Sequence, residues 1–373
     1  MRIALFCHSL LSDWNHGNAH FLRGLVTELA SRGHDVRVWE PHDAWSVTNL
    51  VRDHGEEPLA EVKRVYPALD CVRYDLRGLD LDAALGGTDL VIVHEWSDHE
   101  LVRRIGEAKA RFGFGLLFHD THHRSVSEAS AMERYDLRHY DAVLAFGAVI
   151  RDLYLTHRWA SRAFVLHEAA DIRVFRPMPE VAKDVDLVWV GNWGDDEREQ
   201  ELYEFLLQPV RRLGLRARVH GVRYPQRALD ALRDAGIEHA GWLPNHRVPE
   251  AFARAHVTVH VPRRPYAASL PGIPTIRPFE AMACGIPLVS APWRDSEGLF
   301  RRGQDYLLAE NGEQMCAHLD AILSRPELGE SLARSGRERV LERHTCAHRA
   351  DQLLEIADRL RRERRAPLET QPV

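Results

Sequence analysis

The sequence is poor in lysine and carries no excess of positive charge. Only three of its 49 basic residues are lysines, at positions 63, 109 and 183, and the formal net charge is −6. Such an arginine bias is typical of a genome's base composition rather than of a function. A protein that binds duplex nucleic acid would show a positive excess. We therefore expect no nucleic-acid partner.

Long apolar runs are also missing. No stretch reaches the roughly 18 apolar residues that suggest a membrane-spanning helix. Residues 1–6 are mostly apolar, but they lead directly into a polar loop that contains histidine, without the features of a signal peptide. We expect a cytoplasmic location and no integral membrane segment.

A disulfide framework is not indicated either. The five cysteines are odd in number and form no close pair, which favours reduced thiols over disulfides or a zinc site. The 22 histidines are scattered rather than tandem, so no metal-binding tract is predicted.

What the sequence does have is a regular alternation of strand and helix patterns. Its 373 residues suggest two domains of about 150–200 residues each. An apolar run at 2–7, an amphipathic stretch at 18–31 and a second apolar run at 36–39 predict a strand–helix–strand unit of a parallel sheet. Further strands are predicted at 90–93, 115–118, 142–145 and 164–167.

A second alternation follows a polar segment with two prolines at 177–184, where we place the domain boundary. Strands are predicted at 185–190, 217–220, 257–260 and 287–290, and helices near 197–213, 225–235, 247–255, 311–324 and 328–362. The prediction is an α/β protein whose functional turns lie at the carboxyl edges of two parallel sheets.

The segment from Arg277 to Ser290 carries the most information. It predicts a short helix that Pro278 opens and Gly285 closes, followed at once by an apolar strand. This places Glu280 in the first turn of the helix. A carboxylate there can accept hydrogen bonds from both hydroxyls of a ribose, while the free backbone N–H groups and the helix dipole bind a phosphate. The alternative is that Glu280 only caps a backbone N–H near Arg277.

This segment, with the strand–Gly191–Asn192 turn and the residues 344–349, resembles GT-B-fold glycosyltransferases of the "glycosyl transferases group 1" type, in their CgeB-like branch. The resemblance implies two Rossmann-like domains that face a cleft, a final helix that crosses back to the first domain, and Glu280 on the donor ribose. The family signature has a second glutamate eight positions upstream of Glu280, where this chain has Gly272. The missing carboxylate leaves retaining and inverting chemistry both open.

The domain ranges that follow are the N-terminal acceptor-side domain 1–176, the C-terminal donor domain 177–345, the crossover helix 346–362 and a flexible tail 363–373.

Two glycine-containing turns of the second half are candidates for the donor diphosphate. The turn at Gly191 and Asn192 follows a predicted strand, and Arg198 follows in the next helix. Arg223 comes after a similar turn. Backbone N–H groups and arginine forks are suited to phosphate oxygens, although Gly191 could also serve only a tight turn.

The resemblance further places the nucleobase near Trp242 and Leu243, although Trp242 could equally pack between sheet and helix. The first turn of the helix predicted after Arg277 supplies further candidate donor-binding residues: Arg277, Phe279 and Glu280.

Polar groups also follow several strands of the first half. The loop residues Asn15, His16 and Gly17 lead into a helix and are candidates for the acceptor or the donor sugar, as are His94 and Glu95. We expect His119 and Asp120 to be catalytic, with His119 facing the donor sugar, because the strand 115–118 should end at the cleft. These same loops could instead hold a metal ion. The family resemblance favours no metal, because cationic side chains and helix ends neutralise the diphosphate.

The function indicated is metal-independent transfer of a sugar, with the character of a hexosyltransferase, from a nucleotide-diphospho-sugar to a hydroxyl of a small molecule or glycan, with no further cofactor. Two alternatives stay open: a sugar-nucleotide 2-epimerase of the same fold, and a non-catalytic protein that binds sugar nucleotides.

Overall fold

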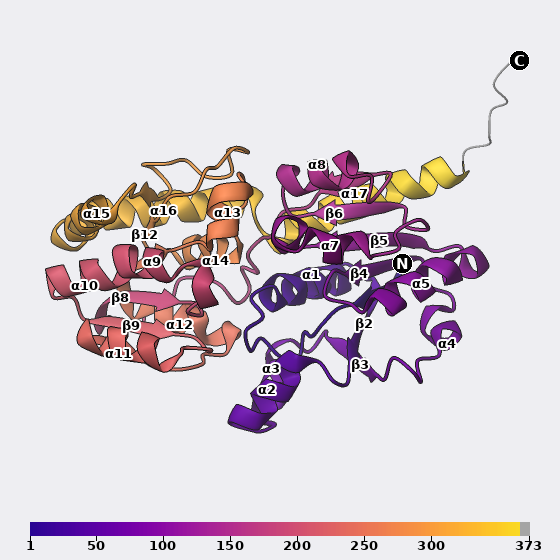
Figure 1. The fold of residues 1–373 in the computed structure, drawn as a ribbon, viewed down its shortest axis with the longest axis horizontal. Helices are drawn as coiled ribbons and strands as arrows, with labels where there is room; N and C mark the ends of the chain where they lie inside the picture. Colours follow the sequence, from indigo (N-terminus) through magenta and orange to yellow (C-terminus); the bar gives the residue numbers. More distant parts are fainter. Residues whose placement is uncertain (366–373) are drawn as a thin grey trace, which may run out of the picture.

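The computed structural model describes residues 1–365, which form two parallel sheets, each covered by helices on both faces (Figure 1). The first sheet has seven strands in the order β3-β2-β1-β4-β5-β6-β7. Their bounds are β1 Arg2–Phe6, β2 Asp35–Pro41, β3 Asp70–Tyr74, β4 Leu90–His94, β5 Gly115–Asp120, β6 Ala142–Ala145 and β7 Ala163–Val165. The order reverses between β1 and β4, which is where parallel α/β sheets open a crevice for ligands.

The second sheet has six strands in the order β10-β9-β8-β11-β12-β13. They are β8 Val185–Val190, β9 Ala217–His220, β10 Ile237–His239, β11 Ala255–His260, β12 Leu288–Ser290 and β13 Leu307–Leu308. The α/β prediction with two parallel sheets is therefore confirmed.

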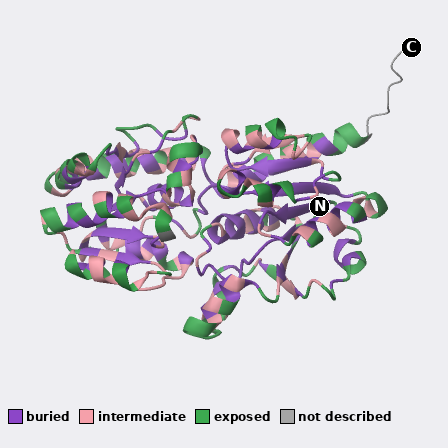
Figure 2. Ribbon diagram, viewed as in Figure 1, coloured by how far each residue is buried: buried purple, intermediate pink, exposed green. Residues whose placement is uncertain are grey.

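In each sheet, side chains of the central strands pack into two hydrophobic cores, one on each face of the sheet. Along β1, Ile3 and Leu5 belong to one apolar cluster, whereas Ala4 and Phe6 belong to another. In β8, Leu187 and Val188 divide in the same way. Successive side chains of a strand point to opposite faces, so a strand buried on both sides must be apolar throughout. Figure 2 shows both sheets as buried layers beneath more exposed helices.

The helices of the first domain lie between its strands in sequence. They are α1 Ala19–Ser31, α2 Trp45–His54, α3 Glu57–Val65, α4 Leu81–Leu85, α5 His99–Phe112, α6 Arg124–Ser127, α7 Ala129–Glu133 and α8 Ala148–Thr156.

The second domain carries three-residue 3₁₀ turns at Asp195–Glu197 and Asn245–Arg247 and a π-helical turn at Tyr203–Leu207. Its α-helices are α9 Glu199–Leu202, α10 Gln208–Leu213, α11 Gln226–Asp234, α12 Val248–Ala253, α13 Arg264–Ser269, α14 Ile276–Cys284, α15 Gly312–Ser324 and α16 Pro326–Arg343. None of the helices in residues 1–365 is long and apolar enough to cross a membrane.

The last helix, α17 (Cys346–Arg365), returns to the first domain and lies along α1 (Figure 1). Its buried residues, spaced three or four apart, join the same cluster as α1 and β1; they are Cys346, Ala350, Leu353, Ala357 and Leu360. The expected crossover is thus present. The helix continues past 362 to Arg365, into the segment predicted as a tail, and residues 366–373 lie outside the described part of the chain.

Several elements differ from the prediction. The edge strands β3 and β10 were not expected, because short edge strands with charged residues lack a clear apolar run. The helical stretch predicted at 197–213 is divided by the π-helical turn at 203–207. The amphipathic helices expected within 328–362 are α16 and α17, with a turn at His344 and Thr345 between them.

Candidate functional site

A cavity of about 980 Å³ lies between the two domains, where the carboxyl ends of strands from both sheets meet. Its walls include the segments that follow β4 and β5 in the first domain and β8, β9 and β11 in the second. A smaller cavity of about 100 Å³ adjoins it and shares lining residues with it, among them Asn15, Gly191 and Arg277. Ligand sites of parallel α/β proteins are expected at such carboxyl edges of the sheets.

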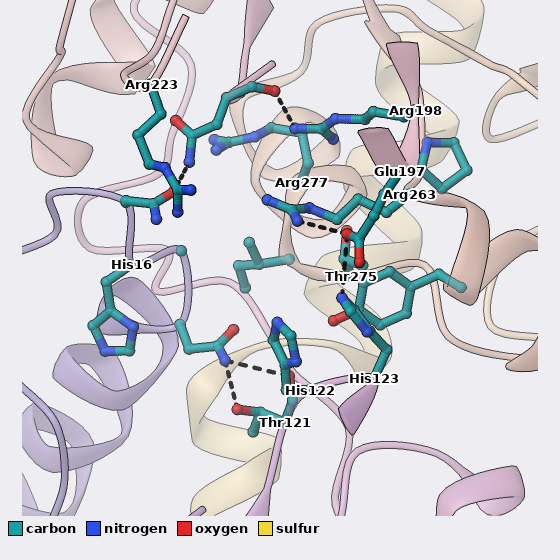
Figure 3. A pocket seen from close by; sticks show the side chains of 18 of the residues that line it. His16, Thr121, His122, His123, Glu197, Arg198, Arg223, Arg263, Thr275 and Arg277 are labelled. Carbon is teal, nitrogen blue, oxygen red and sulfur yellow. Dashed lines mark hydrogen bonds and ion pairs between the residues drawn. The ribbon is translucent and has the colours of Figure 1, made fainter. Parts of the chain in front are cut away.

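The amino end of α14 opens onto the larger cavity. Thr275, Ile276 and Arg277 line the wall there (Figure 3). The first backbone N–H groups of a helix have no partner within the helix and carry its positive dipole end, so this end is suited to an anion. The helix begins at Ile276, two residues before Pro278, and Glu280 therefore lies beyond the first turn rather than in it.

Glu280 is fully buried, and its carboxylate has three side-chain partners. Oε1 lies 2.7 Å from His20 Nδ1 and accepts a hydrogen bond from Asn245 Nδ2 at 3.0 Å, while Oε2 pairs with the Arg277 guanidinium. Burial alone would raise the pKa of Glu280, but Arg277 and His20 hold it below its ordinary value. Glu280 lines neither cavity, and its partner Arg277 lines both. The capping alternative fails, since the partner from residue 277 is the side chain.

Gly272, which stands where the sequence resemblance leads one to expect a glutamate, lines neither cavity. Gly272 has φ +92°, and a Cβ at this position would come within 2.7 Å of Glu297 Oε1. Glu297 in turn accepts from the Ala148 N–H and pairs with His167, both in the first domain. A glutamate at 272 would therefore be strained and would disturb a contact between the domains.

Four arginines of the second domain line the larger cavity (Figure 3): Arg198, Arg223, Arg263 and Arg277. Arg198 donates to the Val261 carbonyl at 3.1 Å and lies over the Trp189 ring. Burial lowers the pKa of Arg198 to about 9, with Arg263 contributing in the same direction. An anion bound between these groups would relieve their mutual repulsion.

The turn at Gly191 and Asn192 lies where the sequence places it, at the wall of both cavities. Asn192 Oδ1 accepts from the Val222 N–H at 3.1 Å, and its amide contacts the Asn15 side chain across the domain boundary. Gly17 and the buried His16 line the same wall, and the Nε2 of His16 makes no hydrogen bond within the described residues. Burial lowers the pKa of His16 well below its ordinary value, so this ring is neutral near pH 7.

Trp242 and Leu243 line the smaller cavity. The Trp242 ring lies 4.7 Å from His54 of the first domain, and its Nε1 has no hydrogen-bond partner in residues 1–365. Phe279 is placed differently from the expectation: it packs against Phe300 in the core and lines neither cavity.

His119 also lies away from the cavity. Its ring faces Phe21 and His94 and borders a small apolar cavity, and burial lowers its pKa to about 4. His94 Nε2 contacts Thr121 Oγ1 at 2.9 Å, and Thr121 is the residue that reaches the cavity. Since side chains alternate across a strand, the end of β5 directs His119 into the core.

Asp120 and Glu95 form a buried polar layer beneath the cavity. Asp120 accepts from the Tyr154 hydroxyl at 2.9 Å and from the His122 N–H at 3.0 Å. Glu95 pairs with Arg124 at 3.0 Å. Burial raises the pKa of both carboxyl groups. Neither of the two acids lines the larger cavity, so they hold the loop after β5 in place.

Some cavity residues were missed in the sequence. Glu197 joins Arg263 at 2.6 Å and His123 at 3.5 Å, which links the two domains across the cavity (Figure 3). Glu168 follows β7 and also lines the wall. Glu168 directly follows the strand predicted at 164–167, and Arg263 follows the strand predicted at 257–260, so this position could have found both residues. Glu197 carries no such signal.

Backbone strain gathers at this site. Three non-glycine residues of the cavity wall have positive φ: Asn15 at +52°, Arg223 at +59° and Thr275 at +61°. Such conformations persist where the surrounding structure enforces them, and they are frequent at ligand sites. For Thr275, whose side chain is β-branched, the conformation is especially unfavourable.

No group of three or more histidine, cysteine, aspartate or glutamate residues in residues 1–365 is arranged to hold a metal ion. The His94–Glu95 and His119–His123 segments are instead engaged with each other and with Arg124, Thr121 and Tyr154.

Two Rossmann-like domains that face a shared cavity, with a last helix that returns to the first domain, define the GT-B fold of glycosyltransferases. Residues 198–355 match the family model described as "Glycosyl transferase-like". No curated protein sequence matches the chain.

Solved structures of several glycosyltransferases have the same fold. Sucrose-phosphate synthase from Thermosynechococcus elongatus is 15% identical, with a TM-score of 0.67 over 97% of this chain and 100% of that one. Anabaena HepE in complex with UDP is 13% identical, with a TM-score of 0.66 over 96% and 100%. An α-glucosyltransferase in complex with UDP and DNA is 11% identical, with a TM-score of 0.66 over 96% and 99%.

Proposed function

We propose that this protein is a glycosyltransferase that moves a hexose from a nucleotide-diphospho-sugar to an acceptor hydroxyl without a metal ion. The observation that carries the proposal is the convergence of Arg198, Arg223, Arg277 and the amino end of α14 on one cavity between the domains. The match of residues 198–355 and the solved structures with bound UDP support the same reading.

The proposed donor lies along the second domain. The nucleobase occupies the smaller cavity, beside Trp242 and Leu243, and the diphosphate lies between the arginines and α14. Glu280 acts indirectly, because it is buried and orients Arg277 and Asn245. This replaces the direct contact to ribose expected from the sequence.

In the reaction, the acceptor oxygen forms a bond to the anomeric carbon as the bond from that carbon to the diphosphate oxygen breaks. The nucleoside diphosphate leaves with the electron pair, and the proton of the acceptor hydroxyl is released. The cationic side chains and the helix end stabilise the charge that develops on the leaving group. Closure of the two domains over the bound donor limits attack by water.

We assign the catalytic pair of the sequence prediction a supporting role. His119 reaches the cavity only through His94 and Thr121, and Asp120 only through the loop that contains His122. The acceptor enters from the first domain, beside Asn15, His16 and Gly17. A small molecule or glycan suits this acceptor site better than nucleic acid, given the net charge of −6.

A panel of nucleoside diphosphates and their hexosyl esters tests the proposal. Binding should raise the melting temperature, because a ligand that binds the native state stabilises it. Product analysis then separates transfer, which needs an acceptor, from epimerisation, which does not, and from binding without turnover. Transfer should survive exhaustive chelation; loss with EDTA and recovery with a divalent ion would contradict the metal-independent mechanism.

A further inference from the structure

The carboxyl group of Glu168 lies in the wall of the larger cavity without a partner. The residue is only 2% exposed and lines the cavity. Its Oε1 is buried and accepts no hydrogen bond, and Glu168 forms no ion pair within residues 1–365. A buried polar side chain without a partner is uncommon in native proteins, because its desolvation is not compensated.

His167, the residue before Glu168, is fixed by three contacts. The ring of His167 contacts the Phe146 carbonyl at 2.9 Å and Glu297 of the second domain at 3.0 Å. The His167 carbonyl accepts from Arg349 of α17 at 2.8 Å. Glu168 is therefore presented to the cavity by a rigid segment where the two domains join.

The other carboxylates of the cavity wall already have partners. Glu197 is bound by Arg263 and His123. Asp196 and Glu128 are exposed and lie 3.3 Å from Arg227 and 3.7 Å from Arg124, respectively. Among the cavity carboxylates of the described residues, Glu168 alone combines burial with the absence of a partner.

The surroundings of Glu168 favour its neutral form. Burial raises its pKa well above the ordinary value, and the nearby charge of Glu280 raises it further, while Arg277 opposes this. A neutral carboxyl can donate one hydrogen bond and accept another, which is the pattern that a sugar hydroxyl matches.

We propose that Glu168 binds a hydroxyl of the hexose that the protein transfers, an inference that rests on the proposed function. The O–H of the carboxyl donates to the hydroxyl oxygen, and its carbonyl oxygen accepts the hydroxyl hydrogen. The phosphate groups lie instead at the arginines and α14, because cations and helix ends are the better partners for them.

Two variants and a control test this assignment. Glu168→Met keeps the side-chain volume but removes both hydrogen bonds, whereas Glu168→Gln keeps a donor and an acceptor. Glu128→Gln changes another carboxylate of the wall that is exposed and paired. Calorimetric titrations with UDP, GDP, UDP-glucose and GDP-mannose compare each bare diphosphate with its hexosyl ester.

The prediction applies to whichever diphosphate and hexosyl ester the native protein binds. Glu168→Met should lower the affinity for the hexosyl ester by about tenfold and change the affinity for the bare diphosphate by less than about twofold. Glu168→Gln should stay within about threefold of the native protein for both, as should Glu128→Gln. Because the native carboxyl lacks a partner, Glu168→Met should fold with an unchanged or higher melting temperature.

The inference is overturned if Glu168→Met binds the hexosyl ester as the native protein does, or loses both ligands equally. A native protein that binds no member of the full panel of nucleoside diphosphates and hexosyl esters would instead overturn the proposed function itself. Calorimetry on the native protein alone separates these two failures.

Discussion

At the scale of the residue, Glu280 shows how one buried charge can join distant segments. It brings together His20 of α1, Asn245 near α12 and Arg277 of its own helix. A carboxylate removed from water is stable only when its partners replace the lost hydration. The cluster therefore couples the position of Arg277, at the cavity, to the contact between the domains.

Replacing Glu280 by glutamine should weaken this cluster. The neutral amide cannot balance the Arg277 charge, so we expect the free energy of unfolding to fall by roughly 2–4 kcal/mol. Affinity for the nucleoside diphosphate should fall as well, because Arg277 loses its fixed orientation. Urea denaturation and calorimetry measure the two effects.

Glu250→Gln is a suitable control, since Glu250 only meets Arg247 at 3.5 Å on a partly exposed helix face. Its effect on unfolding should stay within about 0.5 kcal/mol. A Glu280→Gln variant as mild as this control would contradict the role assigned to the cluster.

Asp120 should make stability depend on pH in the mildly acidic range. Burial raises the pKa of Asp120 from 3.8 to about 6. Between these values the folded protein keeps a proton that the unfolded chain has released, so stability falls as the pH rises through this window. The asparagine in Asp120→Asn can still accept a hydrogen bond from the His122 N–H and can donate one to the Tyr154 hydroxyl oxygen. Because it cannot titrate, the change in the free energy of unfolding across this pH window should shrink by on the order of 1–3 kcal/mol. Denaturation curves from pH 4 to pH 7 decide; an equal slope in both proteins would refute the assignment.

At the scale of the element, the start of α14 is strained where it meets the cavity. Thr275 has φ +61° and ψ −179°, a region that is almost exclusive to glycine. This conformation places the first N–H groups of the helix at the cavity wall. The strain is thus located at the part of the helix that the proposed diphosphate would contact.

Thr275→Gly should relieve this strain and raise the free energy of unfolding by about 1 kcal/mol, after the greater freedom of glycine in the unfolded chain is counted. It should also weaken binding of the nucleoside diphosphate, because the helix end becomes less fixed. Thermal melts and calorimetry measure both effects.

Arg158 offers a matched comparison, since it has φ +57° but does not line the cavity. Arg158→Gly should stabilise the fold and leave nucleotide affinity unchanged. If Thr275→Gly lowered stability, the strain argument would be wrong.

At the scale of the whole molecule, the two domains are held together by α17 and by polar side-chain pairs across their boundary. Within residues 1–365, histidine–carboxylate pairs join the domains at four places: His20–Glu280, His123–Glu197, His167–Glu297 and His246–Glu61. The α17 helix adds an apolar contact with α1, where Gly24 meets Cys346. The geometry of the cavity depends on these contacts.

Gly24→Ala should disrupt that apolar contact. A Cβ at Gly24 would lie 2.5 Å from Cys346 Sγ and 2.7 Å from the Cβ of Asp171. Overpacking of this kind costs about 1–3 kcal/mol or more, so the melting temperature should fall by several degrees. In Gly78→Ala, the added Cβ meets no atom within 4 Å, and the melting temperature should stay the same. Equal behaviour of the two variants would show that α17 does not pack tightly on α1.

Local sequence patterns were enough to predict most inner strands and the sheet edges near which the cavity lies. The predicted strands 142–145, 185–190 and 217–220 coincide with β6, β8 and β9. Their apolar side chains give a local signal, because both faces of an inner parallel strand pack against helices. The turn at Gly191 and the segment around Arg277 were found because glycine, proline and helix periodicity leave local signals. Parallel strands then bring their carboxyl ends to one edge of each sheet.

Which of these side chains reach the cavity depends on the packing of the two domains. His119 and Phe279 point into cores, and Glu280 is buried among partners from three segments. Glu168 instead lines the cavity, with its buried Oε1 unpartnered within residues 1–365. The direction of a side chain at a strand end depends on the exact residue where the strand stops, and a buried charge depends on groups distant in the sequence. Neither is contained in local periodicity, because both follow from how the two domains pack against each other.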